Sequence, residues 1–215
     1  MKYLLLAVMW TVWCTVHSLL ISPRVIRFLK QRLGDRYRFT RIVFNTFAIL
    51  SLVPVVCYSH TLPGDLFIRW DGIWRLVQIP MLGFSLWLFA AGAREYDLPQ
   101  LLGFRQIMEH ESAKGLTRSG GIETTGILGQ VRHPWYSGAI LILWSRNIDA
   151  AALVTNLVLT AYLFIGTLLE ERKLVSEFGE EYVKYQRKVP MLMPRLRARS
   201  TPGKGGSSDD KHLSP

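Results

Sequence analysis

Cysteine and acidic residues are scarce in this 215-residue chain. Its two cysteines, Cys14 and Cys57, lie in apolar stretches without metal-ligand spacing, which argues against a disulfide scaffold or a cysteine zinc site. Only 16 acidic residues face 26 Lys and Arg, a formal net charge of +10. The chain also lacks a Walker loop, a Gly-x-Ser-x-Gly elbow and alternating strand patterns. The common soluble nucleotide-binding and hydrolase folds are therefore not indicated.

Apolar residues are abundant and gathered into blocks. They make up 49% of the chain, with 12% aromatic, and a membrane-spanning helix requires about 20 of them in sequence. Four runs approach or reach that length, and a shorter fifth run covers Val131–Trp144; the four are Tyr3–Ile21, Ile42–Leu62, Leu76–Ala93 and Ala150–Leu169. This pattern predicts an all-α polytopic membrane protein with about five transmembrane helices. The fourth along the chain, Val131–Trp144, is the weakest. We expect one membrane domain over 1–197 and a disordered cytosolic tail over 198–215, which is rich in Gly, Ser and Pro.

Basic residues alternate between loops. Segments 24–41, 94–132 and 172–215 hold 22 of the 26 Lys and Arg, whereas the other connections are nearly neutral. Such alternation is typical of positive-inside sorting in membranes, not of a nucleic-acid surface. It predicts an external N-terminus and a cytosolic C-terminus, with the lipid bilayer as a partner and no nucleic acid. It leaves the oligomeric state open.

The segment Arg132–Tyr136 reads Arg-His-Pro-Trp-Tyr. Pro134 suits the first turn of a helix, and helix N-termini attract anions. Tyr136 follows His133 by three positions, so both side chains share one helix face. The pattern indicates the edge of a pocket for a carboxylate or phosphate. Ordinary anchoring at a membrane interface explains the same residues equally well.

The acidic pair Glu170-Glu171 shifts that balance. Two apolar stretches separate it from His133, so a helical hairpin returns it to the same membrane face. Acids at a helix C-terminus near the bilayer are costly, which marks a functional site unless Arg172 and Lys173 compensate them. A ligand with a carboxylate, an ammonium, hydroxyls and an apolar ring would use both clusters. S-adenosylmethionine is such a ligand.

The two motifs together resemble a known family. The segments TTGILGQVRHPWYSG and EERKLVSEFGEEYVKYQRKVPMLMP, within 117–196, are similar to the isoprenylcysteine carboxyl methyltransferase and phospholipid methyltransferase family of membrane enzymes. The resemblance implies that S-adenosylmethionine is the cofactor. The cofactor-binding residues that it implies are Gly120, Gly121, Ile122, Glu123, His133, Pro134, Trp135, Tyr136 and Glu170.

Two positions depart from the family pattern. Leu128 stands where many relatives have a cofactor-contacting Tyr, and Gly166 stands where the carboxyl methyltransferases place a substrate-handling Arg. Gly166 lies one turn before Glu170 on the same helix face. We therefore expect an apolar substrate space there, bounded by Leu163, Phe164 and span-1 residues near His17.

The resemblance predicts methyl transfer to a hydrophobic or small thiol or amine, at a cytosolic face and without a metal. In a bacterium the membrane would be the inner membrane. The sequence assigns no catalytic residue. Three alternatives remain: a non-catalytic membrane protein of the denitrification-associated type, carboxyl methylation of isoprenylcysteine, and a nicotinamide-dependent activity like that of sterol reductases.

Two smaller expectations concern the ends of the chain. Apolar residues from Leu174 to Val189 recur at helical spacing, which predicts one amphipathic helix after the last span. His17 lies near the cytosolic end of the first span, where a structural hydrogen bond is favoured over a role in the pocket.

Overall fold

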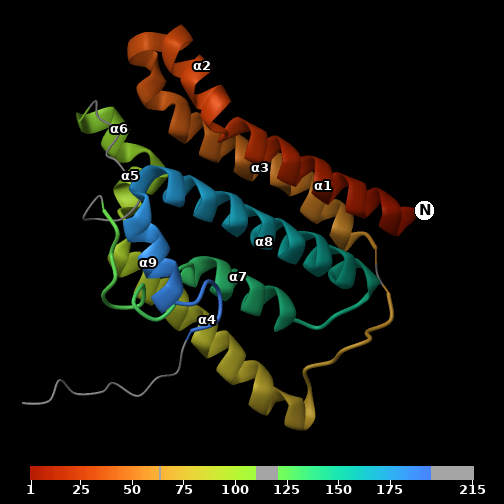
Figure 1. Ribbon diagram of the computed structural model, residues 1–215. Coiled ribbons are helices and arrows are strands. Elements are labelled where there is room, and N and C mark those ends of the chain that lie inside the picture. Colours follow the sequence, from red (N-terminus) through yellow and green to blue (C-terminus); the bar gives the residue numbers. More distant parts are fainter. Residues whose placement is uncertain (63, 110–120, 195–215) are drawn as a thin grey trace, which may run out of the picture.

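The computed structural model describes residues 1–62, 64–109 and 121–194, and over these it is a bundle of helices (Figure 1). Four helical segments are long and apolar enough to cross a membrane. They contain the long helices α1 (Lys2–Leu20), α3 (Thr40–His60), α4 (Arg75–Glu95) and α8 (Ala150–Phe178). The prediction of an all-α polytopic membrane protein is confirmed. Gly120 and the tail 198–215 lie outside the described residues.

Shorter helices connect the long ones. They are α2 (Pro23–Leu33), η1 (Gly34–Phe39), η2 (Gly72–Trp74), α5 (Leu98–Leu102), α6 (Phe104–Glu109), α7 (Pro134–Trp144) and α9 (Glu180–Lys188). Local sequence sets several of the boundaries. Ser22 caps α2 with Pro23 in its first turn, and the Asp149 carboxylate accepts the Ala152 N–H at 2.7 Å to begin α8.

The chain passes five times between two ends of the bundle. Helices α1 and α8 run side by side in the same direction, because Trp10 Nε1 donates to Thr155 Oγ1 at 3.0 Å and Ser18 Oγ lies 3.2 Å from the Tyr162 hydroxyl. Helices α4 and α7 approach closely where Ser85 Oγ donates to the Gly138 carbonyl at 2.8 Å. Small residues permit such backbone approach in membrane bundles.

The fourth passage is the shortest, as the sequence predicted. Helix α7 has 11 residues, which at 1.5 Å per residue is about half of a ~30 Å hydrocarbon layer. Residues 145–149 complete the passage, and their polar backbone is paired: Ile148 exchanges hydrogen bonds with Ile68 in an isolated antiparallel bridge. Pairing of this kind is what allows irregular backbone at membrane depth. The bundle therefore contains four long helices and one short helix that is followed by an extended segment.

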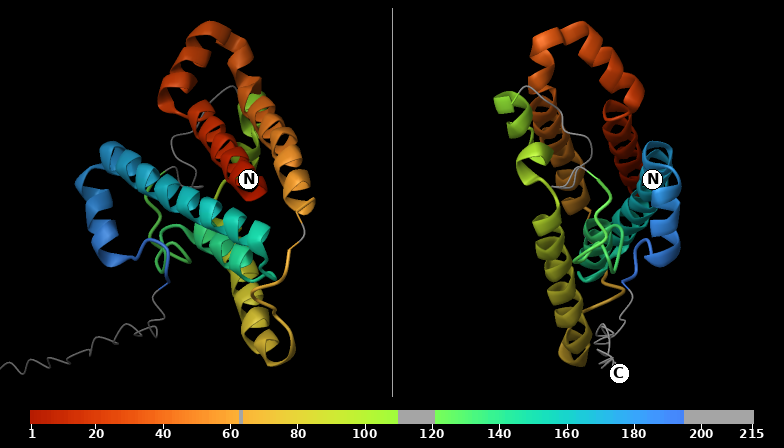
Figure 2. Two further views of the ribbon diagram at one scale, coloured as in Figure 1. Left: turned by 90° about the vertical axis from the view of Figure 1, so that its right-hand side faces the viewer. Right: turned by 60° about the vertical axis from the view of Figure 1, so that its left-hand side comes forward.

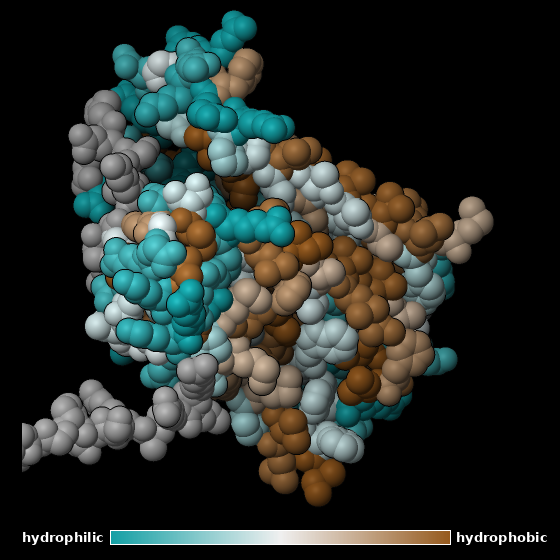
Figure 3. Space-filling model, in the orientation of Figure 1, coloured by the Kyte–Doolittle hydropathy of each residue, from teal (hydrophilic) through white to brown (hydrophobic). Residues whose placement is uncertain are grey.

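The surface has two characters. Apolar side chains cover the flanks of the long helices, whereas polar ones gather around α2 and α9 at one end (Figure 3). Many large apolar residues of α1, α3, α4 and α8 are exposed, Ile49, Leu50, Leu76 and Leu169 among them. An exposed apolar surface of this extent fits a lipid environment.

The predicted helix through Leu174–Val189 is wrong as one piece. Helix α8 ends at Phe178, and Gly179, with φ of +60°, turns the chain into α9 at an angle (Figure 2). Glycine adopts this left-handed conformation at no steric cost. The apolar stripe nevertheless forms one cluster, because Tyr182, Tyr185 and Val189 pack against Leu174 and Phe178 across the turn.

Single-cysteine labelling tests the topology. In a protein with Cys14 and Cys57 replaced by Ala, we expect Asp35→Cys and Glu177→Cys to react from the cytosolic side and Asp65→Cys from the other side. The basic residues near Asp35 and Glu177 predict that this end of the bundle is cytosolic. Labelling of Asp35→Cys and Asp65→Cys from the same side would contradict the five passages.

Candidate functional site

The Glu171 carboxylate holds the two motifs and the C-terminal helix together. Its side chain is 7% exposed. Arg132 binds it through two nitrogens, with Nε 2.9 Å from Oε1 and Nη2 2.7 Å from Oε2. His133 Nε2 lies 2.7 Å from Oε1, the Tyr182 hydroxyl donates at 2.8 Å, and Gln186 Nε2 donates at 2.5 Å. Both oxygens are therefore fully used.

The partners of Glu171 are themselves positioned. Arg132 Nη1 also donates to the carbonyls of Gln186, at 3.0 Å, and of Val189. Burial, followed by the hydrogen bond to Glu171, raises the pKa of the Tyr182 phenol, so the hydroxyl stays a donor. Compensation by Arg172 and Lys173 was the alternative that the sequence left open. It is not seen at Glu171, since both side chains are exposed and Arg132 makes the ion pair.

Glu170 has a different environment from its neighbour. Its side chain is 32% exposed, and the Tyr136 hydroxyl donates to Oε2 at 2.9 Å. His133 Nδ1 lies 3.8 Å from the same oxygen, and the His133 ring stacks on Tyr136 with centroids 5.5 Å apart. The structure thus brings together His133, Tyr136 and Glu170 and leaves the Glu170 carboxylate with acceptor capacity.

Trp135 and Pro134 lie on the α4 side of α7. The Trp135 indole donates to the Phe89 carbonyl at 3.1 Å and packs on Tyr96, with ring centroids 4.7 Å apart. A Cβ at Gly92 would overlap that indole, so glycine is required there. Burial, followed by the charge of Glu170, raises the pKa of the Tyr96 phenol. Tyr96, which the sequence analysis missed, therefore neighbours Glu170.

The N-terminus of α7 is partly covered by the chain itself. The N–H groups of Arg132 and His133 donate to the carbonyls of Pro190 and Met191 at 3.0 and 3.1 Å. Ser137 Oγ lies 2.5 Å from the Leu192 carbonyl. Since Arg132 is also committed to Glu171, this terminus offers an anion fewer donors than the sequence indicated.

The segment before the first motif contributes two described positions of interest. Ile122 packs against the α9 cluster of Tyr182, Tyr185 and Val189. Glu123 is partly exposed, and hydrogen bonds from the Thr125 hydroxyl and N–H lower the pKa of its carboxyl. Leu128 packs in the core, and its carbonyl accepts the Tyr185 hydroxyl at 2.6 Å. A role for Gly121, Ile122 and Glu123 toward a cofactor stays a prediction.

The predicted substrate space is open but has different walls. A Cβ built at Gly166 would meet nothing within 4 Å. Phe164, expected as a wall, is exposed on another part of α8. Tyr162, one turn before Gly166, contacts His17 instead, with ring centroids 6.4 Å apart.

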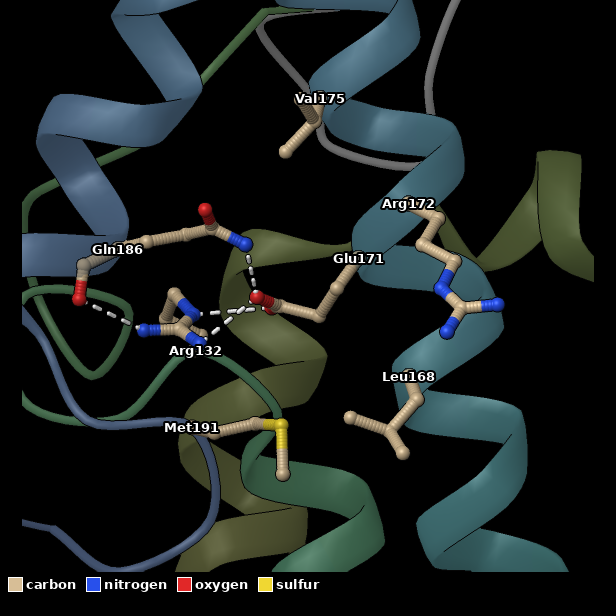
Figure 4. Close-up of a pocket in the computed structure, with 7 residues that line it drawn as sticks. All are labelled: Arg132, Leu168, Glu171, Arg172, Val175, Gln186 and Met191. Atoms are coloured by element: carbon tan, nitrogen blue, oxygen red, sulfur yellow. Dashed lines mark hydrogen bonds and ion pairs between the residues drawn. The ribbon is translucent and has the colours of Figure 1, made fainter.

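A groove of about 470 Å³ lies on the opposite face of α8 (Figure 4). It is lined by Arg132, Leu168, Glu171, Arg172, Val175, Gln186 and Met191. Positions 168, 172 and 175 share one helix face, whereas 162, 166 and 170 share another. Because the Glu171 oxygens in this groove are saturated, Glu170 and the Gly166 space are the better candidate site. Among the described residues, no group of three or more His, Cys, Asp or Glu is placed to hold a metal.

Comparison with known proteins shows which enzymes this chain resembles. No family model and no solved structure matches the chain. The chain is 39% identical over 129 residues to methanethiol S-methyltransferase 2 of Bradyrhizobium diazoefficiens, covering 59% of this chain and 48% of that protein. It is 39% identical over 154 residues to the methanethiol S-methyltransferase of Pseudomonas deceptionensis, covering 68% and 57%.

A more distant match is the protein-S-isoprenylcysteine O-methyltransferase of Schizosaccharomyces pombe, 32% identical over 97 residues and covering 42% of this chain and 40% of that protein. The chain thus spans about half the length of the curated relatives it matches. The comparisons confirm the predicted resemblance to isoprenylcysteine carboxyl methyltransferase-like proteins. Within that group, the two more similar relatives carry the name methanethiol S-methyltransferase.

Removal of the Glu171 carboxylate should lower the stability of the protein. Glu171→Ala leaves Arg132 buried without its partner, which typically costs about 3–5 kcal/mol, so we expect a large fall in the unfolding temperature in detergent. Glu177→Ala, an exposed change on the same helix, is the matched control and should have little effect. Equal unfolding temperatures for the two variants would contradict the central role of Glu171.

Proposed function

We propose that this protein is a membrane methyltransferase that transfers a methyl group from S-adenosylmethionine to a small neutral thiol. The observation that carries the proposal is the meeting of the two motifs at Glu170: Tyr136 donates to a partly exposed carboxylate, while Glu171 holds His133 behind it. The names of the relatives support both the reaction class and the thiol acceptor.

The residues present fit such a cofactor. The Glu170 carboxylate retains acceptor capacity for an ammonium or ribose hydroxyl, since among the described residues only the Tyr136 phenol donates to it at short range. The ring of Tyr136 lies close to that carboxylate, and the ring of Tyr96 packs on the neighbouring Trp135; such rings suit a cationic sulfonium or an adenine. When bound, S-adenosylmethionine supplies an already activated methyl group, so the protein contributes positioning and electrostatics.

The absence of a side chain at Gly166 favours the thiol over a carboxylate acceptor. Gly166 leaves open space one turn from Glu170 and offers no charge to pair with an acidic substrate. A prenylcysteine carboxylate would need a cation close to the transferred methyl. The relative that is named for isoprenylcysteine matches a smaller share of the chain than the two thiol methyltransferases do.

Calorimetry with S-adenosylhomocysteine tests the cofactor. We expect the wild type to bind and Glu170→Ala to bind far more weakly, because losing one partner of a desolvated charged hydrogen bond typically costs about 2–5 kcal/mol. That corresponds to roughly thirty- to several-thousand-fold in the dissociation constant. Glu177→Ala should retain wild-type affinity. Wild-type affinity in Glu170→Ala would show that Glu170 is a structural residue.

A transfer assay tests the acceptor. With labelled S-adenosylmethionine, we expect thioether formation from ethanethiol and little methyl ester from a prenylcysteine analogue. Thioethers survive mild base, whereas methyl esters release labelled methanol. Base-labile product as the dominant outcome would overturn the thiol assignment, and no transfer to either acceptor would favour the non-catalytic alternative.

A further inference from the structure

His17 is surrounded by aromatic rings and has no hydrogen-bond partner within the described part of the chain. Its imidazole stacks on Trp13 with centroids 5.1 Å apart, and Phe44 and Tyr162 lie at 5.0 and 6.4 Å. Nδ1 is buried without a partner among the described residues, so the expected structural hydrogen bond is not found there. Nε2 is not among the buried atoms, and no hydrogen bond engages it. An ionisable side chain left in this condition within a span is a mark of function.

The His17 cluster and Glu170 lie along one face of α8. Tyr162, Gly166 and Glu170 follow one another at intervals of four residues, which places them in a column. His17 and Ser18 of α1 contact Tyr162, at one end of this column. The Tyr136 phenol donates to Glu170, at the other end of the column. It also interacts electrostatically with the phenols of Tyr162 and Tyr96. Between the two ends lies Gly166 with open space beside it.

We propose that the space beside Gly166 is the acceptor site and that the His17 imidazole receives the proton of the thiol. This inference rests on the proposed function. The site would accept a short, uncharged alkanethiol, because the neighbouring His17 cluster includes the rings of Phe44 and Tyr162 and sulfur packs favourably against aromatic rings. His17 is then a catalytic residue, whereas Gly166 sets how large an acceptor fits.

The step balances without a further reactant. His17 Nε2 takes the proton of the thiol, and the thiolate sulfur forms a bond to the methyl carbon. The bond between that carbon and the sulfonium sulfur breaks, and its electron pair stays on the departing sulfur, which becomes a neutral thioether. The imidazolium then returns its proton to water at the membrane face. Proton acceptance matters here because alkanethiols are mostly protonated at neutral pH and the thiolate is the nucleophile.

Two acceptors separate the proton-accepting role of His17 from packing. His17→Phe keeps an aromatic ring in the stack and removes the nitrogens. We expect it to retain S-adenosylhomocysteine binding and to lose methyl transfer to ethanethiol by about a hundredfold or more, the range of general base catalysis. Transfer to 2,2,2-trifluoroethanethiol, a thiol as short as ethanethiol but far more acidic, should fall much less because it ionises with less help from a base. Equal losses on both thiols, or no loss on either, would overturn the role of His17.

Glycine substitutions test the place of the acceptor. Gly166→Leu should fill the open space and abolish transfer to both thiols while cofactor binding persists. Gly83→Leu is the matched control, because Gly83 also lies in a long helix with nothing within 4 Å of a built Cβ. Unchanged transfer in Gly166→Leu would overturn the acceptor site. Failure of the wild type to bind S-adenosylhomocysteine or to methylate any thiol would instead overturn the proposed function.

Discussion

The ion pair between Arg132 and Glu171 is the interaction on which the rest of the site depends. Both side chains are buried, so neither tolerates the loss of the other. Through it α7, α8 and α9 are held in one arrangement, with His133, Tyr182 and Gln186 filling the remaining positions on the carboxylate. Because His133 is fixed in this way, Tyr136 is held in register one turn later and reaches Glu170. The arrangement around Glu170 is therefore supported by a neighbouring glutamate whose own oxygens are already fully hydrogen-bonded.

Adjacent positions on a helix point about 100° apart, and the two glutamates use that difference. Glu171 turns toward α7 and α9 and is enclosed, whereas Glu170 turns toward the face shared by Tyr162 and Gly166 and remains partly exposed. Glu171 stabilises the packing of the helices, whereas Glu170 can still accept hydrogen bonds. A pair of acids at the membrane boundary is thus neither redundant nor interchangeable.

Much of the fold followed from the sequence, because long apolar runs leave few alternatives in a bilayer and a hairpin must return to its starting face. This is why the meeting of His133 with the acidic pair was predictable. Which of the two glutamates is enclosed was not predictable, since it depends on Arg132, just before α7, and on Tyr182 and Gln186 of α9. Local patterns also failed where tertiary contacts decide: the turn at Gly179 interrupts a continuous apolar stripe, and no pattern indicated that Ile148 pairs with Ile68.

The contacts of residues 190–192 with the start of α7 have a consequence for biosynthesis. A membrane protein is made from its N-terminus, and its domains form as they emerge. Here the N–H groups of Arg132 and His133 receive their partners only from Pro190 and Met191, and Glu171 receives two of its donors from α9. The spanning helices are therefore synthesised before the residues that complete these contacts. A chain that ends before α9 would insert its helices but would lack the α9 donors to Glu171.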